Sequence, residues 1–418
     1  TTVTWVEDIN GRFEVSSPEH LKQIMNNGSL YANAGTIPSN FLSADYIQTT
    51  DIDLLNDSTD IVPITVGGVY DGDLSSISNW SYLDPEFETT ADCVDRAGLF
   101  GTISGTVKNV RMIGVCTLSG FKANAGMVVG YISQRNMINV EADLSPGSGI
   151  FQGNVGTSTY AAKIGGVAGQ LQRECLVKGV TLRGTLDMAH SNGYRVGGII
   201  GDVVYSTIEL IQNLATFPSG IVGSDGAGGI AGRWLHADES ISCLNAMRGD
   251  ITSTFAGGIF GEAEVNIDSG NTPFEKMVNS MTGNITGSSG SGGIVGYFGA
   301  FGSYIVNEAV NYMTGNISSG FCGGIFGRIT PDGGMTITSS INAMNGDVDN
   351  TVVGSGGTGV VVTVDTTFGM TFNSNSFSTS TAPAGFLTDP TFTNLPYREM
   401  TGTDPDGSAY DFGFIFSN

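Results

Sequence analysis

Apolar residues and glycines recur along this chain in one short phrase. Each copy starts with two small residues, continues with two or three apolar residues and closes on glycine. The eight copies are AGLFG at 97–101, AGMVVG at 125–130, GGVAG at 165–169, GGIIG at 197–201, GGIAG at 228–232, GGIFG at 257–261, GGIVG at 292–296 and GGIFG at 323–327. The last six begin 32, 31, 29, 35 and 31 residues apart. Such a period predicts a repeat architecture.

A second phrase, Asn-x-Met-x-Gly followed by Asn or Asp and then Ile or Val, runs in phase with the first. It begins at Asn245, Asn279, Asn311 and Asn342. Its Met, Gly and Ile or Val residues lie two positions apart, which is the period of a β-strand with one buried face. We therefore expect the Met and Ile side chains to face a core. The four Asn side chains should stack as an amide ladder, each hydrogen-bonded to the next coil.

A repeat of about 30 residues matches one coil of a parallel β-helix, in which three short strands are joined by turns. Helical repeats are disfavoured because each glycine would cost about 1 kcal/mol in a helix and the 3.6-residue apolar pattern is missing. The predicted fold is an all-β, right-handed parallel β-solenoid of about 30-residue coils. Eight or nine coils stacked about 4.8 Å apart would make a rod of roughly 40 Å.

Both ends of such a rod need caps, because a solenoid exposes unpaired strand edges there. Residues 17–25 predict a short N-terminal capping helix, with Ser17 as N-cap, Pro18 at the first position and an apolar face over the first coil. The tail at 410–416 alternates aromatic residues and should be buried, either closing the last coil or adding a strand to a neighbouring molecule. The expected division is 1–90 cap and first strands, 91–355 repeats, and 356–418 a C-terminal cap or docking segment.

Composition narrows the choice of partners. The chain has 62 glycines and 40% hydrophobic residues, enough to bury a core, and its net charge is -23. That charge repels phosphate backbones and anionic membrane surfaces, so nucleic acid is not an expected partner. No apolar run reaches the roughly 18 residues of a membrane span. The chain starts at Thr1 without a leader-like segment, which is typical of a mature secreted protein.

Metal and cofactor sites find little support in the sequence. The five cysteines are scattered without a CxxC pair; Cys93 and Cys116 could form a disulfide, with buried free thiols as the alternative. The best calcium candidates, Asp404-Pro-Asp406-Gly407 and Asp51-Ile-Asp53, complete no known calcium loop. We expect no metal and no cofactor.

The repeat phrases resemble the GLUG motif, a glycine-rich repeat of secreted bacterial surface proteins, adhesins and parts of certain IgA-cleaving metallopeptidases. The likeness is carried by AGLFGTISGTVKNV at 97–110 and the GGI-x-G series, with YIQTTDIDL at 46–54 and VYDGDLSSISN at 69–79 similar to the segment that precedes such repeats. It covers roughly residues 15–350 and implies a β-solenoid at a surface. The peptidase members carry a His-Glu-x-x-His helix, whereas His20, His190 and His236 lack that spacing, so peptidase activity is not expected.

The residue after each motif glycine should form a row along one face of the rod. The row is Thr102, Tyr131, Gln170, Asp202, Arg233, Glu262, Tyr297 and Arg328. One interpretation is a solvated ladder of ion pairs; the other is a ligand face on which the tyrosines stack against sugars. Polysaccharide cleavage needs two carboxylates one to two coils apart on one face, and Asp202 and Glu262 lie two coils apart on this row. Arg233 between them should hold both ionised, so no catalytic residue is assigned.

An apolar stripe is expected beside that row. If the third motif position faces the core, strand alternation turns the fourth position outward. That position holds Phe100, Val129, Ala168, Ile200, Ala231, Phe260, Val295 and Phe326. A soluble monomer rarely leaves such a stripe bare. Phe100, Ile200, Phe260 and Phe326, with tail residues Phe412, Phe414 and Phe416, are therefore the predicted subunit interface.

Surface modification and adhesion motifs complete the candidates. Asn27, Asn56, Asn79, Asn284 and Asn316 occupy glycosylation sequons. Arg248-Gly249-Asp250 spells a cell-adhesion tripeptide, but other coils carry Thr-Gly-Asn or Asn-Gly-Asp there, so turn chemistry explains it.

The sequence as a whole predicts a non-enzymatic structural or adhesive protein of an extracellular surface, filament or virus particle. It would be secreted or displayed on a cell or virion surface. It would assemble through solenoid faces and terminal segments, with itself or with other surface or capsid proteins. The alternative is a carbohydrate-active β-helix that binds glycans or acts as a polysaccharide hydrolase or lyase.

Overall fold

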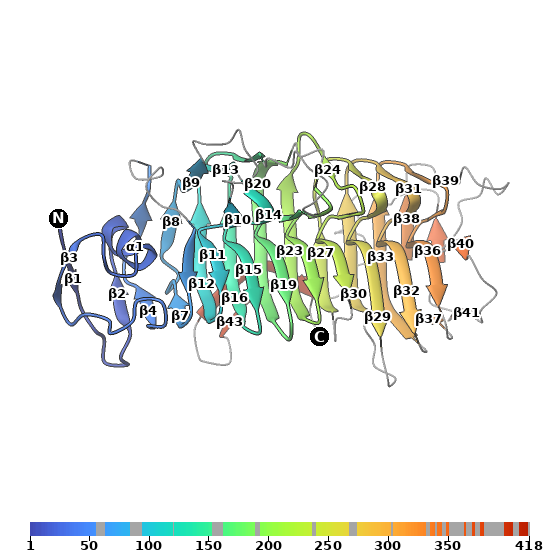
Figure 1. The fold of residues 1–418 in the computed structure, drawn as a ribbon. Coiled ribbons are helices and arrows are strands. Elements are labelled where there is room, and N and C mark those ends of the chain that lie inside the picture. The colour runs from blue at the N-terminus through green and yellow to red at the C-terminus, as the bar shows by residue number, and fades with distance from the viewer. Residues whose placement is uncertain are drawn as a thin grey trace.

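The protein is built almost entirely of parallel strands stacked into an elongated β-solenoid (Figure 1). The computed structural model describes residues 1–55, 63–83, 94–119, 121–152, 162–188, 193–235, 240–266, 274–301, 304–331, 335–338, 341–344, 348–350, 363–364, 370–372, 377–379, 397–403 and 409–416. Side chains are described, with further gaps, up to residue 329. The predicted fold class is confirmed.

Three parallel sheets form the sides of the rod. Sheet 1 contains β10 (Val94–Ala97), β14 (Phe121–Ala125), β18 (Lys163–Gly165), β21 (Arg195–Gly197), β25 (Gly226–Gly228), β28 (Ile251–Gly257), β31 (Ile285–Gly292), β34 (Ile317–Ser319) and β39 (Val348–Asn350), with β24 (Ile221–Val222) and β35 (Cys322–Gly323) alongside. Sheet 2 contains β6 (Ile64–Val66), β11 (Phe100–Ile103), β15 (Val129–Ser133), β19 (Ala168–Gln172), β22 (Ile200–Val204), β26 (Ala231–Leu235), β29 (Phe260–Asn266), β32 (Val295–Phe301), β36 (Phe326–Pro331) and β40 (Thr363–Val364).

Sheet 3 holds the longest strands. From the N-terminal end it contains β2 (Phe13–Val15), β4 (Tyr46–Gln48), β5 (Ile52–Asp53), β7 (Val69–Asp71), β8 (Ser76–Ser78), β9 (Ser81–Leu83), β12 (Thr106–Ile113), β13 (Cys116–Ser119), β16 (Met137–Asp143), β17 (Gly149–Gln152), β20 (Leu176–Asp187), β23 (Thr207–Thr216), β27 (Ser240–Asn245), β30 (Phe274–Met281), β33 (Tyr304–Met313), β37 (Met335–Thr338), β38 (Ile341–Met344), β41 (Met370–Phe372) and β42 (Phe377–Thr379). Two further two-stranded sheets are not paired with these three: β1 (Thr2–Trp5) with β3 (Ala32–Gly35), and β43 (Tyr397–Thr403) with β44 (Ala409–Phe416).

One coil runs through all three sheets in turn. In the middle of the rod, β21 of sheet 1 leads through the GGIIG phrase into β22 of sheet 2, and β23 of sheet 3 follows. Each strand pairs in parallel with its counterpart one coil later, so Asp202 aligns with Arg233 and Asn245 with Asn279. The period seen in the sequence is therefore the length of one coil.

The long strands of sheet 3 bend at one recurring position. There the backbone adopts positive φ, between 53° and 66°, at Asn109, Asn139, Gly179, Leu210, Ser242 and Lys276. Such angles are uncommon for residues other than Gly and Asn. Because the residue type changes from coil to coil, the sequence carries no signal for this bend.

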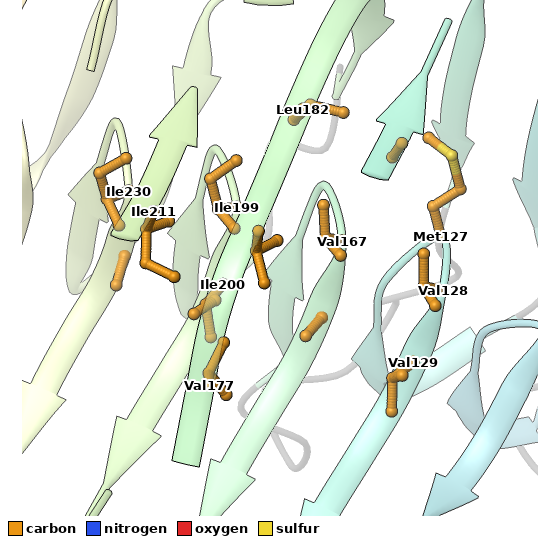
Figure 2. Close-up of a cluster of buried hydrophobic side chains, with 14 of the residues drawn as sticks. Met127, Val128, Val129, Val167, Val177, Leu182, Ile199, Ile200, Ile211 and Ile230 are labelled. Atoms are coloured by element: carbon orange, nitrogen blue, oxygen red, sulfur yellow. The ribbon is translucent and has the colours of Figure 1, made fainter. Parts of the chain in front are cut away.

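The third and fourth motif positions both lie in the core, which corrects the predicted outer stripe. Phe100, Ile200, Phe260 and Phe326 are fully buried within the chain itself. In Figure 2, Ile200 groups with Ile199 of the third position in one apolar cluster.

Aromatic contacts show why the stripe prediction was wrong. Trp234, three positions after the fourth-position residue of its own coil, stacks on Phe260 of the next coil at 5.4 Å between ring centroids. Positions three apart on a regular strand would face opposite ways. The glycine between them therefore interrupts the alternation, so both positions face inward. Alternation also fails between the third and fourth positions, because the strands of sheet 2 begin at the fourth position: β29 starts at Phe260, and Ile259 lies in the bend that leads in from sheet 1.

The predicted asparagine ladder is present in the core. The Nδ2 atom of Asn245 donates to Oδ1 of Asn279 at 2.8 Å, and Nδ2 of Asn279 donates to Oδ1 of Asn311 at 2.9 Å. Asn342 aligns with Asn311 in the backbone register, but its side chain lies outside the described residues. Asn213 extends the row by one coil and donates instead to the carbonyl oxygen of Gly229 at 2.7 Å.

The N-terminal end is covered as the sequence predicted. Helix α1 (Pro18–Met25) has Ser17 as its N-cap, and it contacts β1 and β6 through a face that includes Leu21 and Ile24, both fully buried. Met25 is partly buried against the same core. Among the described residues, no helix is long and apolar enough to cross a membrane.

Candidate functional site

The eight residues that follow the motif glycine align in a single row on sheet 2. Backbone pairing joins them coil by coil from Thr102 to Arg328. The row is thus formed as the repeat spacing implied. The centre of the row is not solvated, because Asp202 is 0% exposed and Glu262 is 9% exposed, whereas the other six residues are half-buried.

A second row, on sheet 1, faces the first. It consists of Arg96, Asn124, Lys163, Arg195, Gly226, Phe255 and Gly290. The guanidinium of Arg96 donates to Thr102 at 3.1 Å and lies 4.0 Å from the ring centroid of Tyr131. Further along, the rings of Phe255 and Tyr297 are 4.8 Å apart. We call these two facing rows the polar seam.

The motif glycines bring the two sheets together. A Cβ atom on Gly201 would overlap the backbone of Lys163 and Ile164 in the neighbouring strand of sheet 1. A side chain at this position would therefore force the sheets apart and open the polar seam.

Asp202 is the most enclosed charge of the seam. Arg233 donates to both carboxylate oxygens, from Nε at 2.8 Å and from Nη2 at 3.2 Å. Gln170 donates to Oδ2 at 3.2 Å, and Nη1 of Arg195 lies 3.6 Å from the same atom. A bidentate arginine and two further donors replace the hydration that burial removes.

Glu262, unlike Asp202, is buried without hydrogen bonds that replace its hydration at Oε2. Burial raises its pKa to about 7; Asp225 and Glu264 push in the same direction, while Arg195 and Arg233 oppose the rise. Its Oε2 atom lies 3.8 Å from Nη2 of Arg195 and has no hydrogen-bond partner. The sequence predicts that Arg233 holds both carboxyls ionised; at Glu262 loss of hydration outweighs the nearby positive charges and raises the pKa.

Sequence reasoning did not predict three members of this charge cluster, Lys163, Arg195 and Asp225. Arg195 links the two rows, because its guanidinium lies 3.6 Å from Asp202 and 3.8 Å from Glu262. The same guanidinium also lies 3.3 Å from Asp225. Lys163 occupies the adjacent coil, where burial lowers its pKa. A signal did exist for the basic residues: Arg96, Lys163 and Arg195 each stand two residues before the first glycine of their repeat phrase, so alternation places them on one face of sheet 1.

The tyrosines proposed as sugar-stacking residues already contact the chain. Arg96 covers the ring of Tyr131, whose hydroxyl donates to Gln172 of the next coil. The ring of Tyr297 contacts Phe255, and the guanidinium of Arg328 lies 6.0 Å from its centroid. Both rings are half-buried, so their role as a ligand face stays a prediction.

The sequons occupy different environments. Asn27, Asn284 and Asn316 are exposed, Asn79 is half-buried, and Asn56 lies outside the described residues. Asn79 donates from Nδ2 to Asp53 at 2.9 Å, so a glycan there would displace a contact between coils. The use of these sites stays a prediction.

The adhesion-like tripeptide belongs to a stack of turns. Oδ1 of Asp250 accepts from the backbone amide of Asn284 at 2.7 Å, and Oδ1 of Asn284 accepts from that of Asn316 at 3.0 Å. Gly249 has a positive φ of 131° and Gly283 of 143°. These contacts explain why each coil has Gly followed by Asn or Asp here.

The remaining candidate residues either make structural contacts or lie outside the described residues. Oδ1 of Asp51 accepts hydrogen bonds from the backbone amide of Ser76 at 2.6 Å and from its hydroxyl at 2.9 Å. These two hydrogen bonds lower the pKa of Asp51. Cys116, Cys175, Cys243 and Cys322 are buried thiols. Cys93 and residues 404–407 lie outside the described residues, as do the side chains of Phe412, Phe414 and Phe416. Among the described side chains, no group of three or more His, Cys, Asp or Glu residues could hold a metal ion.

Comparison with known proteins identifies one similar solved structure. No family model and no curated protein matches the chain. The structure is that of a putative immunoglobulin A1 protease from Bacteroides ovatus, 14% identical, with a TM-score of 0.41 over 97% of this chain and 93% of that one. A likeness this distant carries no argument about function.

Proposed function

We propose that this chain is a non-enzymatic structural or adhesive protein that acts as a stiff rod on an extracellular surface, in a filament or on a virus particle. The observation that carries the proposal is the ordered succession of coils, in which sheet 2 pairs from β6 to β36 in chain order. Side-chain ladders such as Asn245, Asn279 and Asn311 reinforce the same stack from inside. A rod of this kind holds its ends and faces at fixed distances, which both architecture and adhesion require.

The polar seam supports the same proposal. Its central charges bind one another: Asp202 is enclosed by Arg233 and Arg195, and Arg195 also reaches Asp225. A fully buried carboxylate held by a bidentate arginine cannot touch a polymeric substrate without rearrangement of the sheets. The seam therefore fits a role in joining sheet 1 to sheet 2.

Assembly is the property to measure. Sedimentation velocity of the purified chain at physiological salt should reveal species larger than one chain, because the proposed role depends on contact with further copies or with other surface proteins. A single monomeric species at all accessible concentrations would speak against self-assembly and leave adhesion to a foreign partner.

The alternative function is a carbohydrate-active β-helix. Glu262, whose pKa burial raises to about 7, has the protonation behaviour of a general acid. Its intended partner Asp202 is covered and paired, which argues against the reaction. A turnover screen on polysaccharides, run with wild type and Glu262→Gln, separates the two functions. Cleavage that the substitution abolishes would establish the enzyme.

A further inference from the structure

The outer surface of sheet 3 carries a row of five side chains, four of them buried and the fifth, Leu244, half-buried. Thr181 on β20, Gln212 on β23 and Leu244 on β27 align coil by coil. The next residues on the latter two strands, Asn213 and Asn245, lie in the core ladder. Because neighbours on a strand point to opposite faces, the aligned row points outward.

Burial of this row is unexpected for an outer face. Thr181 is 2% exposed and Gln212 is 1% exposed, whereas the row begins at Arg111 and Glu141, an ion pair accessible to solvent. Beyond Leu244 the row continues as Val278 and Val310, both buried. We call Thr181, Gln212, Leu244, Val278 and Val310 the sheet 3 stripe. Something must lie over it.

The C-terminal hairpin, β43 and β44, is in the right place. Strand β44 contacts β20 and β27, the strands on either side of Gln212. Figure 1 shows the C-terminus beside the middle of the rod, whereas β39 and β40 lie at the far end. The chain thus returns along the rod after its last coils. In sequence, β44 alternates aromatic residues at 410, 412, 414 and 416, as expected of a strand with one apolar face.

The hairpin shares no described strand pairing with the solenoid. Its two strands pair only with each other, in an antiparallel sheet separate from the solenoid sheets. Both amide atoms of Gln212 and the hydroxyl of Thr181 are buried without a hydrogen-bond partner. Unsatisfied buried polar groups oppose docking, because water would satisfy them when the hairpin leaves. Detachment of the hairpin would therefore break none of the strand pairings described for the solenoid.

We propose that the sheet 3 stripe is the docking surface for the C-terminal hairpin of a second copy, so that exchanged hairpins link molecules. The inference rests on the proposed function and identifies the contact through which copies assemble. In sequence, residues 380–396 lie between β42 and β43. Seventeen residues reach at most about 58 Å when fully extended, so an exchanged hairpin docks on a rod within that distance. The same surface and segment serve both the internal and the exchanged contact.

Single-cysteine cross-linking tests the exchange. One chain carries Leu244→Cys in the stripe, and a second, differently tagged chain carries Phe412→Cys or Gly413→Cys in β44. Neighbouring strand positions face opposite ways, so one of the two tail variants presents its thiol to the stripe. Tyr205→Cys, an exposed position in a turn, replaces Leu244→Cys as matched control. Wild type, whose described cysteines are buried, sets the background.

The expected result after mixing and oxidation is a disulfide-linked heterodimer for Leu244→Cys with one tail variant, and its loss with the Tyr205→Cys control. No heterodimer with either tail variant would overturn the inference. Sedimentation of the same wild-type chain separates the two failures. Assembly without the cross-link rejects only the hairpin exchange, whereas absence of both rejects the self-assembly part of the proposed function as well.

Discussion

Replacing Glu262 with glutamine should make stability less dependent on pH. Burial raises the pKa of Glu262 from an ordinary 4.5 to about 7. A raised carboxyl pKa means that the folded chain holds a proton that the unfolded chain releases. The free energy of unfolding keeps its full value below about pH 4.5, where both states bind this proton. It falls as the pH rises through about 7, because the unfolded chain has then released the proton. Between these values the slope is about 1.4 kcal/mol per pH unit, so the total loss is about 3 kcal/mol.

Glutamine cannot ionise and keeps nearly the same shape. Glu262→Gln should therefore match wild type near pH 4.5 and exceed its stability by up to about 3 kcal/mol at pH 8. Urea unfolding followed by tryptophan fluorescence measures this, because Trp234 is buried in the strand paired with β29. Glu264→Gln, on the same strand at a half-buried position, is the matched control. If Glu262→Gln is less stable than wild type at pH 8, the ion pair with Arg195 outweighs desolvation and the reasoning fails.

Three further substitutions test the packing. Asn279→Ala removes one donor and one acceptor from the core ladder and should cost about 2–4 kcal/mol, seen as a lower urea midpoint; an unchanged midpoint would show that the ladder adds nothing. Gly261→Ala would push a methyl group into the backbone of Ala227 and should destabilise by about 1–3 kcal/mol in thermal melts, whereas Gly299→Ala should be tolerated. Phe260→Ala should cost about 3–5 kcal/mol and shift the emission of Trp234; a loss of assembly with unchanged stability would restore the interface interpretation.

Sequence reasoning succeeded where the repeat itself carries the information. Equivalent residues of successive coils stack, so the row from Thr102 to Arg328 and the ladder from Asn245 to Asn311 followed from spacing alone. It failed where alternation breaks. The bend between sheets 1 and 2 separates the third motif position from the fourth, so Ile259 and Phe260 both face the core although they are neighbours in sequence.

Burial was the other quantity that spacing could not supply. Glu262 is desolvated because sheet 1 packs over it, and the partners that surround it, Arg195 and Asp225, come from another side of the coil. The covered face at Gln212 depends on the C-terminal hairpin, about 200 residues further along the chain, which no local pattern connects to it.

Electron microscopy of the purified full-length chain at physiological salt tests the central claim most directly. The account predicts ordered assemblies, filaments or particles, in which rods repeat with a fixed spacing. Dispersed single rods at every concentration examined would contradict a role built on self-assembly.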